Sequence, residues 1–446
     1  MFAGRRIGLF RILVLIVVLA GSALLLHRLE YIDHEMVTDS IRQFGYKNAE
    51  DKIKMPAGVR NTQDGLKIEY VEVADRQGTP QEIAHINFQR WKNVQQKKIH
   101  EPKDFNIEKI RPPADPATYD RELASIVSLV RNREMHALES SMREFEEKFN
   151  SKFLYPYTFL NEQPFSQKFK EKMRSLTKAE VNFVHIPNEV WRKPFDIDTL
   201  KEKEGIQSLL DDGVGYSDME SYHNMCRFYS GAFYKLPELQ KYRYYMRMEP
   251  DVKFFTDINY DIFKYLSGTG KVYGFTVALY DSPQSVRTLF PETIKFLNEG
   301  NNSEYLHPRG AFQFTTESRQ HPEIHKITGG YSTCHFWSNF EIADMDFFRG
   351  EAYSKYFEYL DSTGKFYYER WGDAPVHSLG LSLFADKLKI HWFQDIGYFH
   401  FPYYNCPNNE QTKGCNNGQF DEFNDLANQN CMGTWLHFET GVKDVY

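Results

Sequence analysis

The chain has 446 residues and a formal net charge of −7 at pH 7, and its length is sufficient to bury a sizeable core. Its lysines and arginines are scattered, so the basic stripe that marks a nucleic-acid-binding protein is excluded. Aromatic residues make up 16% of the chain, and their flat faces suit stacking on sugars as well as filling a core.

The N-terminus carries a membrane-targeting pattern. An apolar run covers residues 12–26, and three arginines precede it: Arg5, Arg6 and Arg11. This order predicts a cytoplasmic tail over residues 1–6 and an uncleaved signal-anchor helix over residues 7–26, with the remaining chain in the lumen. Cleavage near residues 20–22 is the alternative, and we favour the anchor because the apolar run continues beyond that point.

A polar and charged stretch follows the anchor. Residues 27–115 show little hydrophobic periodicity, which predicts a stem between the membrane and the folded domain. The lumenal domain is then expected over residues 116–446.

The lumenal domain alternates between strand and helix patterns. Segments 124–132 and 155–161 are typical of strands, and the helical spacing of 135–150 between them predicts a βαβ unit. The order predicts an α/β fold, with a mostly parallel mixed sheet flanked by helices. Further strands are expected at 181–187, 244–251, 272–280 and 389–401, and further helices at 199–211, 220–232 and 351–362.

The cysteines fit an oxidising compartment. The last three of the five lie within a segment rich in Asn, Gly and Gln, where a disulfide can hold a loop that has little apolar surface. Their spacing lacks the paired C-x2-C halves of a zinc ribbon. Because five is odd, at least one thiol is free or bonded to another chain. The sequence leaves the pairing open among Cys226, Cys334, Cys406, Cys415 and Cys431.

Acidic groups are concentrated in YRYYMRMEPDVKFFTDINYD, residues 242–261. Its last part imitates the start of a calcium loop, but Ile262 stands where the sharp turn needs Gly, so a calcium loop is excluded. Glu249 and Asp251 follow an apolar strand, where ligands bind in α/β sheets. Carboxylates there can hold a divalent ion that neutralises a diphosphate.

Two alternatives to this metal site remain. The acidic pair can instead be neutralised by Arg243 or Arg247. A rival pair, Asp344 and Asp346, follows a second strand-like segment. The pattern alone does not choose between these possibilities.

Several long blocks of the chain resemble the fungal Golgi alpha-1,2-mannosyltransferase family. The resemblance spans roughly residues 120–446 and is carried by YMRMEPDVKFFTDINYDIFKYL, by the block from CHFWSNFEIADMDFF to ERWGDAPVHSLGLSLF, and by KIHWFQDIGYFHFPYYNCP. It implies a single-pass type II Golgi membrane protein with a GT-A nucleotide-sugar fold. It also implies GDP-mannose as donor, Mn²⁺ as cofactor and retention of the α configuration.

The resemblance matches two residues to metal ligands, and two further residues are candidates for binding the donor. Glu249 and His400 match the metal ligands of the family, and a carboxylate with a neutral imidazole is a sensible pair for Mn²⁺. Arg131, after the first strand, is a candidate for the donor phosphates. Asp251 is expected to bind the donor beside Glu249.

Three further residues receive catalytic roles from the resemblance. Glu341 matches the glutamate placed against the anomeric carbon, and Asp373 and Tyr222 match pocket residues. Glu341 could act as a nucleophile or could stabilise oxocarbenium charge, and we favour the second. The structural alternative is a strand glutamate paired with Arg370.

The activity implied is transfer of mannose from GDP-mannose to a mannose hydroxyl, in α-1,2 linkage, on O- or N-linked glycans of glycoproteins. Transfer of mannosylphosphate to the same glycans is the alternative within enzymes. A non-catalytic mannan-binding protein is the alternative outside them.

Overall fold

The structure is a computed structural model that describes residues 59–61, 68–70, 78–438 and 445–446. The predicted cytoplasmic tail and signal anchor lie outside the described residues. Among the residues that are described, none forms a helix both long and apolar enough to span a membrane.

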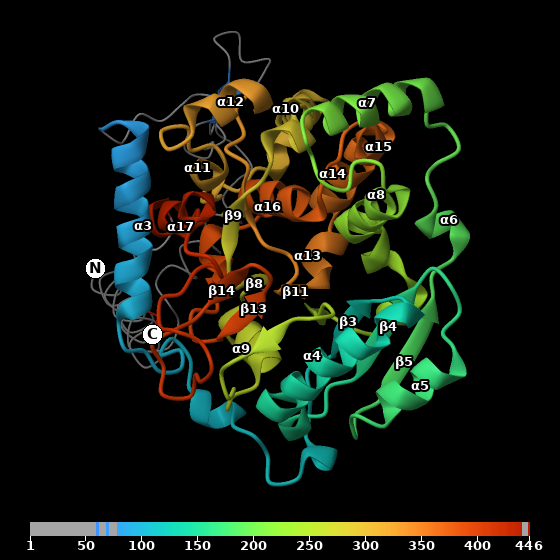
Figure 1. Ribbon diagram of the computed structural model, residues 1–446, viewed down its shortest axis with the longest axis vertical. Coiled ribbons are helices and arrows are strands. Elements are labelled where there is room, and N and C mark those ends of the chain that lie inside the picture. The colour runs from blue at the N-terminus through green and yellow to red at the C-terminus, as the bar shows by residue number, and fades with distance from the viewer. Residues whose placement is uncertain (1–58, 62–67, 71–77, 439–444) are drawn as a thin grey trace, which may run out of the picture. The chain divides into compact units, whose positions relative to one another are not determined.

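A seven-stranded sheet lies at the centre of the described domain (Figure 1). Its order is β12-β8-β11-β6-β3-β4-β5, and only β11 runs antiparallel to its neighbours. The predicted mostly parallel mixed sheet is therefore confirmed. The strands are β3 (Ala124–Leu129), β4 (Tyr157–Asn161), β5 (Val181–His185), β6 (Tyr244–Arg247), β8 (Tyr273–Phe275), β11 (Glu341–Asp344) and β12 (Ile390–Trp392).

Two segments predicted as single strands are each broken in two. Segment 272–280 forms β8 and then β9 (Ala278–Tyr280), which pairs with β10 (Cys334–Phe336) outside the main sheet. Segment 389–401 forms β12 and then β13 (Tyr398–His400). Segment 272–280 is almost entirely apolar, so its periodicity does not reveal the break. In segment 389–401 the break coincides with the polar pair Gln394-Asp395 and with Gly397, which the prediction of a single strand passed over. β13 joins a three-stranded sheet with β7 (Lys253–Phe254) and β14 (Tyr403–Asn405).

Helices cover both faces of the main sheet, and the helices predicted from the sequence are all present. The segment predicted at 220–232 is α8 followed by a π-helical turn. The helices are α3 (Pro80–Gln96), α4 (Met135–Lys148), α5 (Gln167–Arg174), α6 (Asn188–Trp191), α7 (Thr199–Asp211), α8 (Glu220–Arg227), α9 (Ile262–Thr269), α10 (Leu289–Asn298), α11 (Phe312–Thr315), α12 (Pro322–Thr328), α13 (Met345–Arg349), α14 (Glu351–Ser362), α15 (Lys365–Tyr368), α16 (Asp373–Phe384) and α17 (Met432–Phe438). A separate hairpin consists of β1 (Val59–Asn61) and β2 (Ile68–Tyr70).

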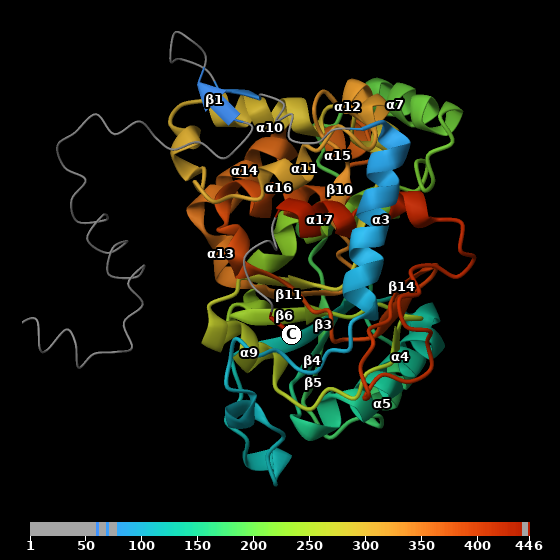
Figure 2. The same cartoon turned by 90° about the vertical axis from the view of Figure 1, so that its left-hand side faces the viewer.

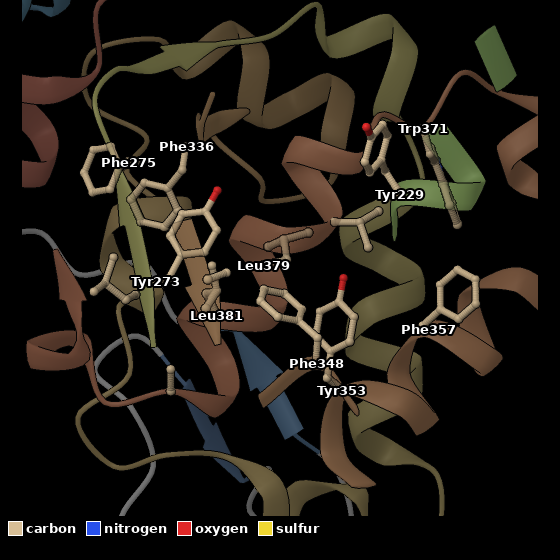
Figure 3. Packing of buried hydrophobic residues seen from close by; sticks show 14 of the residues in the cluster. Tyr229, Tyr273, Phe275, Phe336, Phe348, Tyr353, Phe357, Trp371, Leu379 and Leu381 are labelled. Carbon is tan, nitrogen blue, oxygen red and sulfur yellow. The ribbon is translucent and has the colours of Figure 1, made fainter. Parts of the chain in front are cut away.

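Alternation along the strands divides the core into two clusters. Ile126 and Met246 face α4, α5 and α9, whereas Val127 and Tyr245 face the opposite cluster, which includes α14 and α16. This period of two is what a strand buried on both faces requires. Figure 3 shows the second cluster, where rings from β8 and β10 pack beside leucines of α16.

The predicted stem is wrong at its C-terminal end, because residues 78–115 belong to the folded domain. Helix α3 packs against α17 (Figure 2). Its buried stripe has a spacing of four residues and is half polar: Ile83, Asn87, Trp91 and Gln95. Such a stripe gives a weak hydrophobic signal, which explains why the sequence pattern missed the helix.

Two disulfides hold the C-terminal segment. Cys406 bonds to Cys415 and closes a short loop, and Cys334 bonds to Cys431. Cys226 is a buried free thiol. The predicted unpaired cysteine is therefore Cys226.

Candidate active site

A cavity with a volume of about 520 Å³ lies at the carboxyl ends of β3 and β6. This is the edge at which ligands bind in open α/β sheets. A smaller cavity of about 150 Å³ adjoins it and shares Leu129, Tyr222 and Met225 with it. Four residues that were predicted from the sequence line the larger cavity: Tyr222, Glu249, Asp373 and His400.

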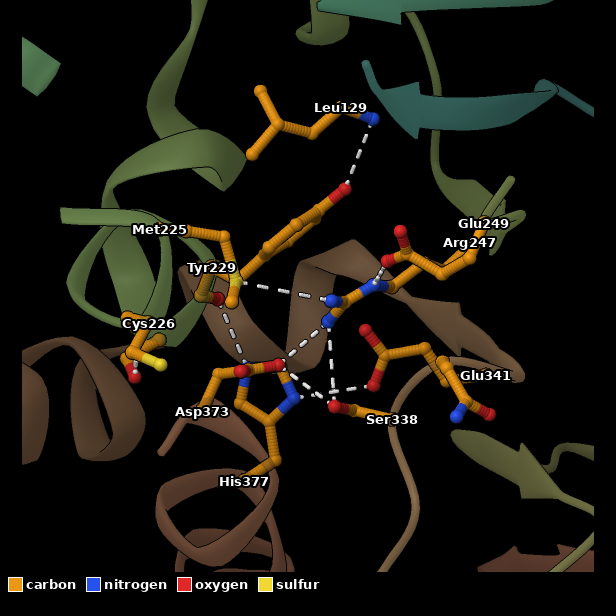
Figure 4. A network of polar contacts seen from close by, with 12 residues as sticks. Leu129, Met225, Cys226, Tyr229, Arg247, Glu249, Ser338, Glu341, Asp373 and His377 are labelled. Atoms are coloured by element: carbon orange, nitrogen blue, oxygen red, sulfur yellow. Dashed lines mark hydrogen bonds and ion pairs between the residues drawn. The ribbon is translucent and has the colours of Figure 1, made fainter. Parts of the chain in front are cut away.

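A buried arginine connects two of these residues (Figure 4). Arg247, the last residue of β6, is 6% exposed; its Nε lies 2.5 Å from Oε1 of Glu249 and its Nη1 lies 2.6 Å from Oδ2 of Asp373. Its guanidinium carbon lies 3.7 Å from the ring centroid of Tyr229. The predicted ion pair between Arg247 and Glu249 is therefore present. Glu249 still lines the cavity.

Asp373 begins helix α16 and is held in its charged form. Ser338 Oγ donates a hydrogen bond to Asp373 Oδ2 over 2.7 Å. Burial alone would raise the pKa of Asp373, but the neighbouring positive charge of Arg247 holds it below its ordinary value. The two carboxylates that flank Arg247 are thus fixed in position before any ligand binds.

One ring nitrogen of His400 is engaged by the backbone, and the other is left as an acceptor. Its Nδ1 lies 3.1 Å from the carbonyl oxygen of Phe401, which requires that Nδ1 carry the proton and leaves Nε2 with a lone pair. Burial lowers the pKa of His400, so the neutral imidazole is favoured. The edge-to-face ring of Trp337, at 5.1 Å, supports this orientation.

The charges that line the cavity suit a divalent cation. Two arginines, Arg247 and Arg370, face three carboxylates: Glu249, Asp281 and Asp373. A diphosphate would meet a net negative wall unless a cation accompanied it. Among the described residues, no group of three or more His, Cys, Asp or Glu side chains is arranged so that it could hold a metal ion. Glu249 and His400 both line the cavity, and their role as metal ligands stays a prediction.

Glu341 lies behind the cavity wall. Its carboxylate is fully buried and accepts hydrogen bonds from Tyr245 Oη at 2.7 Å and Tyr273 Oη at 2.9 Å. His377 Nδ1 lies 3.1 Å away. Burial lowers the pKa of His377, but the charge of Glu341, the hydrogen bond to Glu341 and the charge of Asp373 together raise it above its ordinary value. Ser338 and Asn339 line the cavity, whereas Glu341 is not among its lining residues.

The role of Glu341 against the anomeric carbon stays a prediction. The alternative pairing with Arg370 is wrong. Arg370 instead contacts Tyr222 Oη at 3.3 Å and forms an ion pair with Asp281 at 3.5 Å.

The remaining predicted residues differ in whether they line one of the two cavities. Arg131 lines the smaller cavity and forms an ion pair with Glu162 at 3.4 Å. Tyr222 lines both cavities, and its ring stacks on Tyr216 at 4.8 Å. Asp251 is exposed and lines neither cavity.

The other acidic groups of segment 242–261 are structural. The Lys152 amine contacts the carboxylate of Asp257 and, at 2.9 Å, the amide oxygen of Asn259. Asp261 caps α9 and accepts a hydrogen bond from Tyr155. A lysine therefore occupies the place at which the sequence imitates a calcium loop.

The rival acidic pair is also structural. Asp344 ends β11, and Arg243 Nη2 donates to it over 2.8 Å. Its other carboxylate oxygen caps α13. Arg370 lies in the block ERWGDAPVHSLGLSLF but is considered in the sequence only as a partner of Glu341, and Asp281 lies outside the blocks that carry the family resemblance. The two come from separate segments and meet only in the folded protein.

The chain matches the family model described as "Glycolipid 2-alpha-mannosyltransferase" over residues 81–440. It is 43% identical to the probable mannosyltransferase KTR4 of Saccharomyces cerevisiae, over 82% of this chain and 79% of that protein. It is 42% identical to the O-glycoside alpha-1,2-mannosyltransferase omh1 of Schizosaccharomyces pombe, over 69% of this chain and 77% of that protein.

Solved structures support the same assignment. The crystal structure of the mannosyltransferase Ktr4p of S. cerevisiae in complex with GDP has a TM-score of 0.79 and 42% identity, covering 84% of this chain and 95% of that chain. The Mn/GDP form of core-mannan synthase A from Aspergillus fumigatus has a TM-score of 0.71 and 41% identity, covering 86% and 98%. These likenesses confirm the predicted GT-A-like fold and the predicted family. The chain belongs to the glycolipid 2-alpha-mannosyltransferase family.

Proposed function

We propose that this chain is a retaining α-1,2-mannosyltransferase that moves mannose from GDP-mannose to a mannose hydroxyl on O- or N-linked glycans of glycoproteins. The observation that carries the proposal is the placement of Glu249 and His400 on one cavity wall, at the carboxyl ends of β3 and β6, in a member of this family. The relatives solved with GDP and with Mn/GDP support a nucleotide-sugar donor.

Glu249 and His400 would hold Mn²⁺, which, when bound, neutralises the charge that develops on the departing diphosphate. Arg247 holds Glu249 and Asp373 in place on the cavity wall. Arg370 offers a buried positive charge at the same wall, with its guanidinium oriented by Asp281. Asp373 contributes a carboxylate to the cavity lining, and Glu341, the partner of His377, lies behind the wall.

We also propose that the chain is a single-pass type II protein of the Golgi membrane, anchored by residues 7–26, with its catalytic domain in the lumen. The stem is then shorter than the sequence pattern suggests, because the folded domain already includes α3. Limited proteolysis of sealed Golgi vesicles should leave the domain intact until detergent is added. Digestion without detergent would contradict the lumenal orientation.

The activity can be tested with the purified full-length protein. With GDP-mannose, Mn²⁺ and methyl α-mannoside, we expect an α-1,2-linked disaccharide, identified by the proton and carbon spectra of the product. A phosphodiester signal in the phosphorus spectrum of the product would instead identify mannosylphosphate transfer. Binding of mannan without any product would identify a non-catalytic protein. Glu249→Gln is the matched control, because it keeps the shape of the side chain and removes its charge.

A further inference from the structure

Two phenylalanine rings stand exposed beside the cavity. Phe401 and Phe423 are each 60% exposed, and their rings meet edge to face with centroids 5.9 Å apart. Phe401 occupies the two-residue tip of the β13–β14 hairpin. Large apolar side chains are usually buried, so an adjacent exposed pair next to the cavity-lining residue His400 indicates a binding surface.

The chain holds both rings in place before any ligand arrives. The N–H of Glu422 donates to the carbonyl of Pro402 over 2.9 Å, so the segment that carries Phe423 lies beside the hairpin tip. The carboxylate of Asp421 accepts the N–H of Phe423 over 3.1 Å and fixes the turn. A surface that is ordered in advance loses little conformational entropy when it binds.

The hairpin connects these rings directly to the cavity. His400 and Tyr403 face each other across β13 and β14 on either side of the tip, and both line the cavity. Trp337 also lines it and meets each of those two rings edge to face at 5.1 Å. Gln429, a further lining residue, accepts a hydrogen bond from the Tyr403 hydroxyl. The tip that carries Phe401 therefore lies, along the chain, directly between two cavity-lining residues, His400 and Tyr403.

The chemistry of this surface suits a neutral sugar. The apolar face of a pyranose ring packs on aromatic rings, and its hydroxyls bind to carboxylates and amides. Glu422 and Asp425 are exposed beside Phe423, and Gln429 lies on the cavity side. These acidic neighbours disfavour an anionic lipid surface. An occupant that also reaches the cavity fits this position, because the residues on either side of the tip, His400 and Tyr403, line the cavity.

We propose that Phe401 and Phe423 form a second acceptor subsite, which stacks on the sugar that precedes the mannose accepting transfer. The inference rests on the proposed function, since it extends the same cavity toward the acceptor. It predicts that the enzyme favours an acceptor of two mannoses over a single mannose, because only the longer acceptor reaches the exposed rings.

The test compares methyl α-mannoside with a methyl α-mannobioside as acceptors for the full-length protein. In the unsubstituted enzyme, KM for the monosaccharide should exceed KM for the disaccharide. Phe401→Ala and Phe423→Ala should reduce this KM ratio by a few-fold to about tenfold, the range expected for one ring contact. Phe401→Tyr should restore it. Phe195→Ala is the matched control, because that phenyl ring is fully exposed elsewhere and should leave the ratio unchanged.

An unchanged ratio in both alanine variants would overturn the subsite while leaving the proposed function standing. If the unsubstituted enzyme transferred no mannose, the proposed function would fail, and saturation-transfer NMR with the mannobioside would still decide the subsite. We expect saturation of both sugar rings, with loss at the second ring in Phe401→Ala. Saturation confined to one ring would contradict the subsite. A dimer in solution that Phe401→Ala dissociates would show that a second copy covers the rings, and would also overturn it.

Discussion

Arg247 and Asp373 form an ion pair of 2.6 Å between side chains that are 6% and 7% exposed. The pair joins the end of β6 to the start of α16, and the same guanidinium holds Glu249. One buried cation thus positions two carboxylates of the cavity. Removing it would leave both carboxylates near each other without their counter-charge.

Substitution of Arg247 should therefore destabilise the domain strongly. We expect Arg247→Met to lower the free energy of unfolding by about 3–5 kcal/mol, the cost of leaving a buried charge unpaired. Urea unfolding measures the loss. The control is Lys235→Met, whose ion pair with Glu358 is 49% and 62% exposed and should contribute only about 0–1 kcal/mol. Equal losses in the two variants would contradict the role of Arg247.

The ion pair between His377 and Glu341 should make stability depend on pH. Because Glu341 raises the pKa of His377 above 6.5 in the folded state, this pair stabilises the protein fully below pH 6.5. Its contribution is lost as the pH rises through the folded pKa. The difference in unfolding free energy between the unsubstituted protein and His377→Gln should therefore shrink with rising pH. A difference that grew with pH would mean that His377 is held neutral.

Asp395 provides a second pH-dependent group, remote from the cavity. It is buried and accepts hydrogen bonds from Tyr260 Oη at 2.9 Å and Tyr446 Oη at 3.0 Å. Burial raises its pKa from 3.8 to about 7. Its stabilising contribution is therefore present below pH 3.8 and lost as the pH rises toward 7. Asp395→Asn should lack this decline in urea unfolding measured across the same pH range, and an identical decline in the variant would assign it to another group.

The burial of Glu341 leads to a chemical prediction. Glu341→Ala should leave Tyr245, Tyr273 and His377 without their acceptor and should cost about 3–5 kcal/mol of stability. The rate of mannose transfer should fall together with the stability. Added azide should yield no β-mannosyl azide, because the Glu341 side chain does not line the cavity. Mass spectrometry of the products tests this. A β-mannosyl azide would place Glu341 at the anomeric carbon and support a covalent route.

Much of the order of strands and helices could be predicted from the sequence, because it depends on local hydrophobic patterns. The βαβ unit follows from periodicity, and the position of Glu249 follows from the apolar strand before it. The break within 272–280 could not be predicted, since that segment is almost entirely apolar. The break within 389–401 has a marker in Gln394, Asp395 and Gly397, which separate two apolar runs. Helix α3 was not predicted from the sequence, because half of the residues on its buried side are polar.

The site was predictable only in part, for a different reason. Arg247 could be named as a counter-charge of Glu249, but its second partner, Asp373, lies 126 residues away in the chain. Arg370 and Asp281 likewise meet only in the folded protein. Contacts between such distant segments leave no spacing in the sequence to recognise.

Donor binding in this cavity, through a cation held by Glu249 and His400, is central to the proposed function. Electron paramagnetic resonance of Mn²⁺, titrated with the protein and GDP, tests it most directly. We expect binding that requires GDP, and an affinity that falls by at least about tenfold in Glu249→Gln and in His400→Ala, because even the loss of a residue that only orients a metal ligand typically costs about tenfold or more. Mn²⁺ affinity equal to that of the unsubstituted protein in both variants would contradict this mode of donor binding.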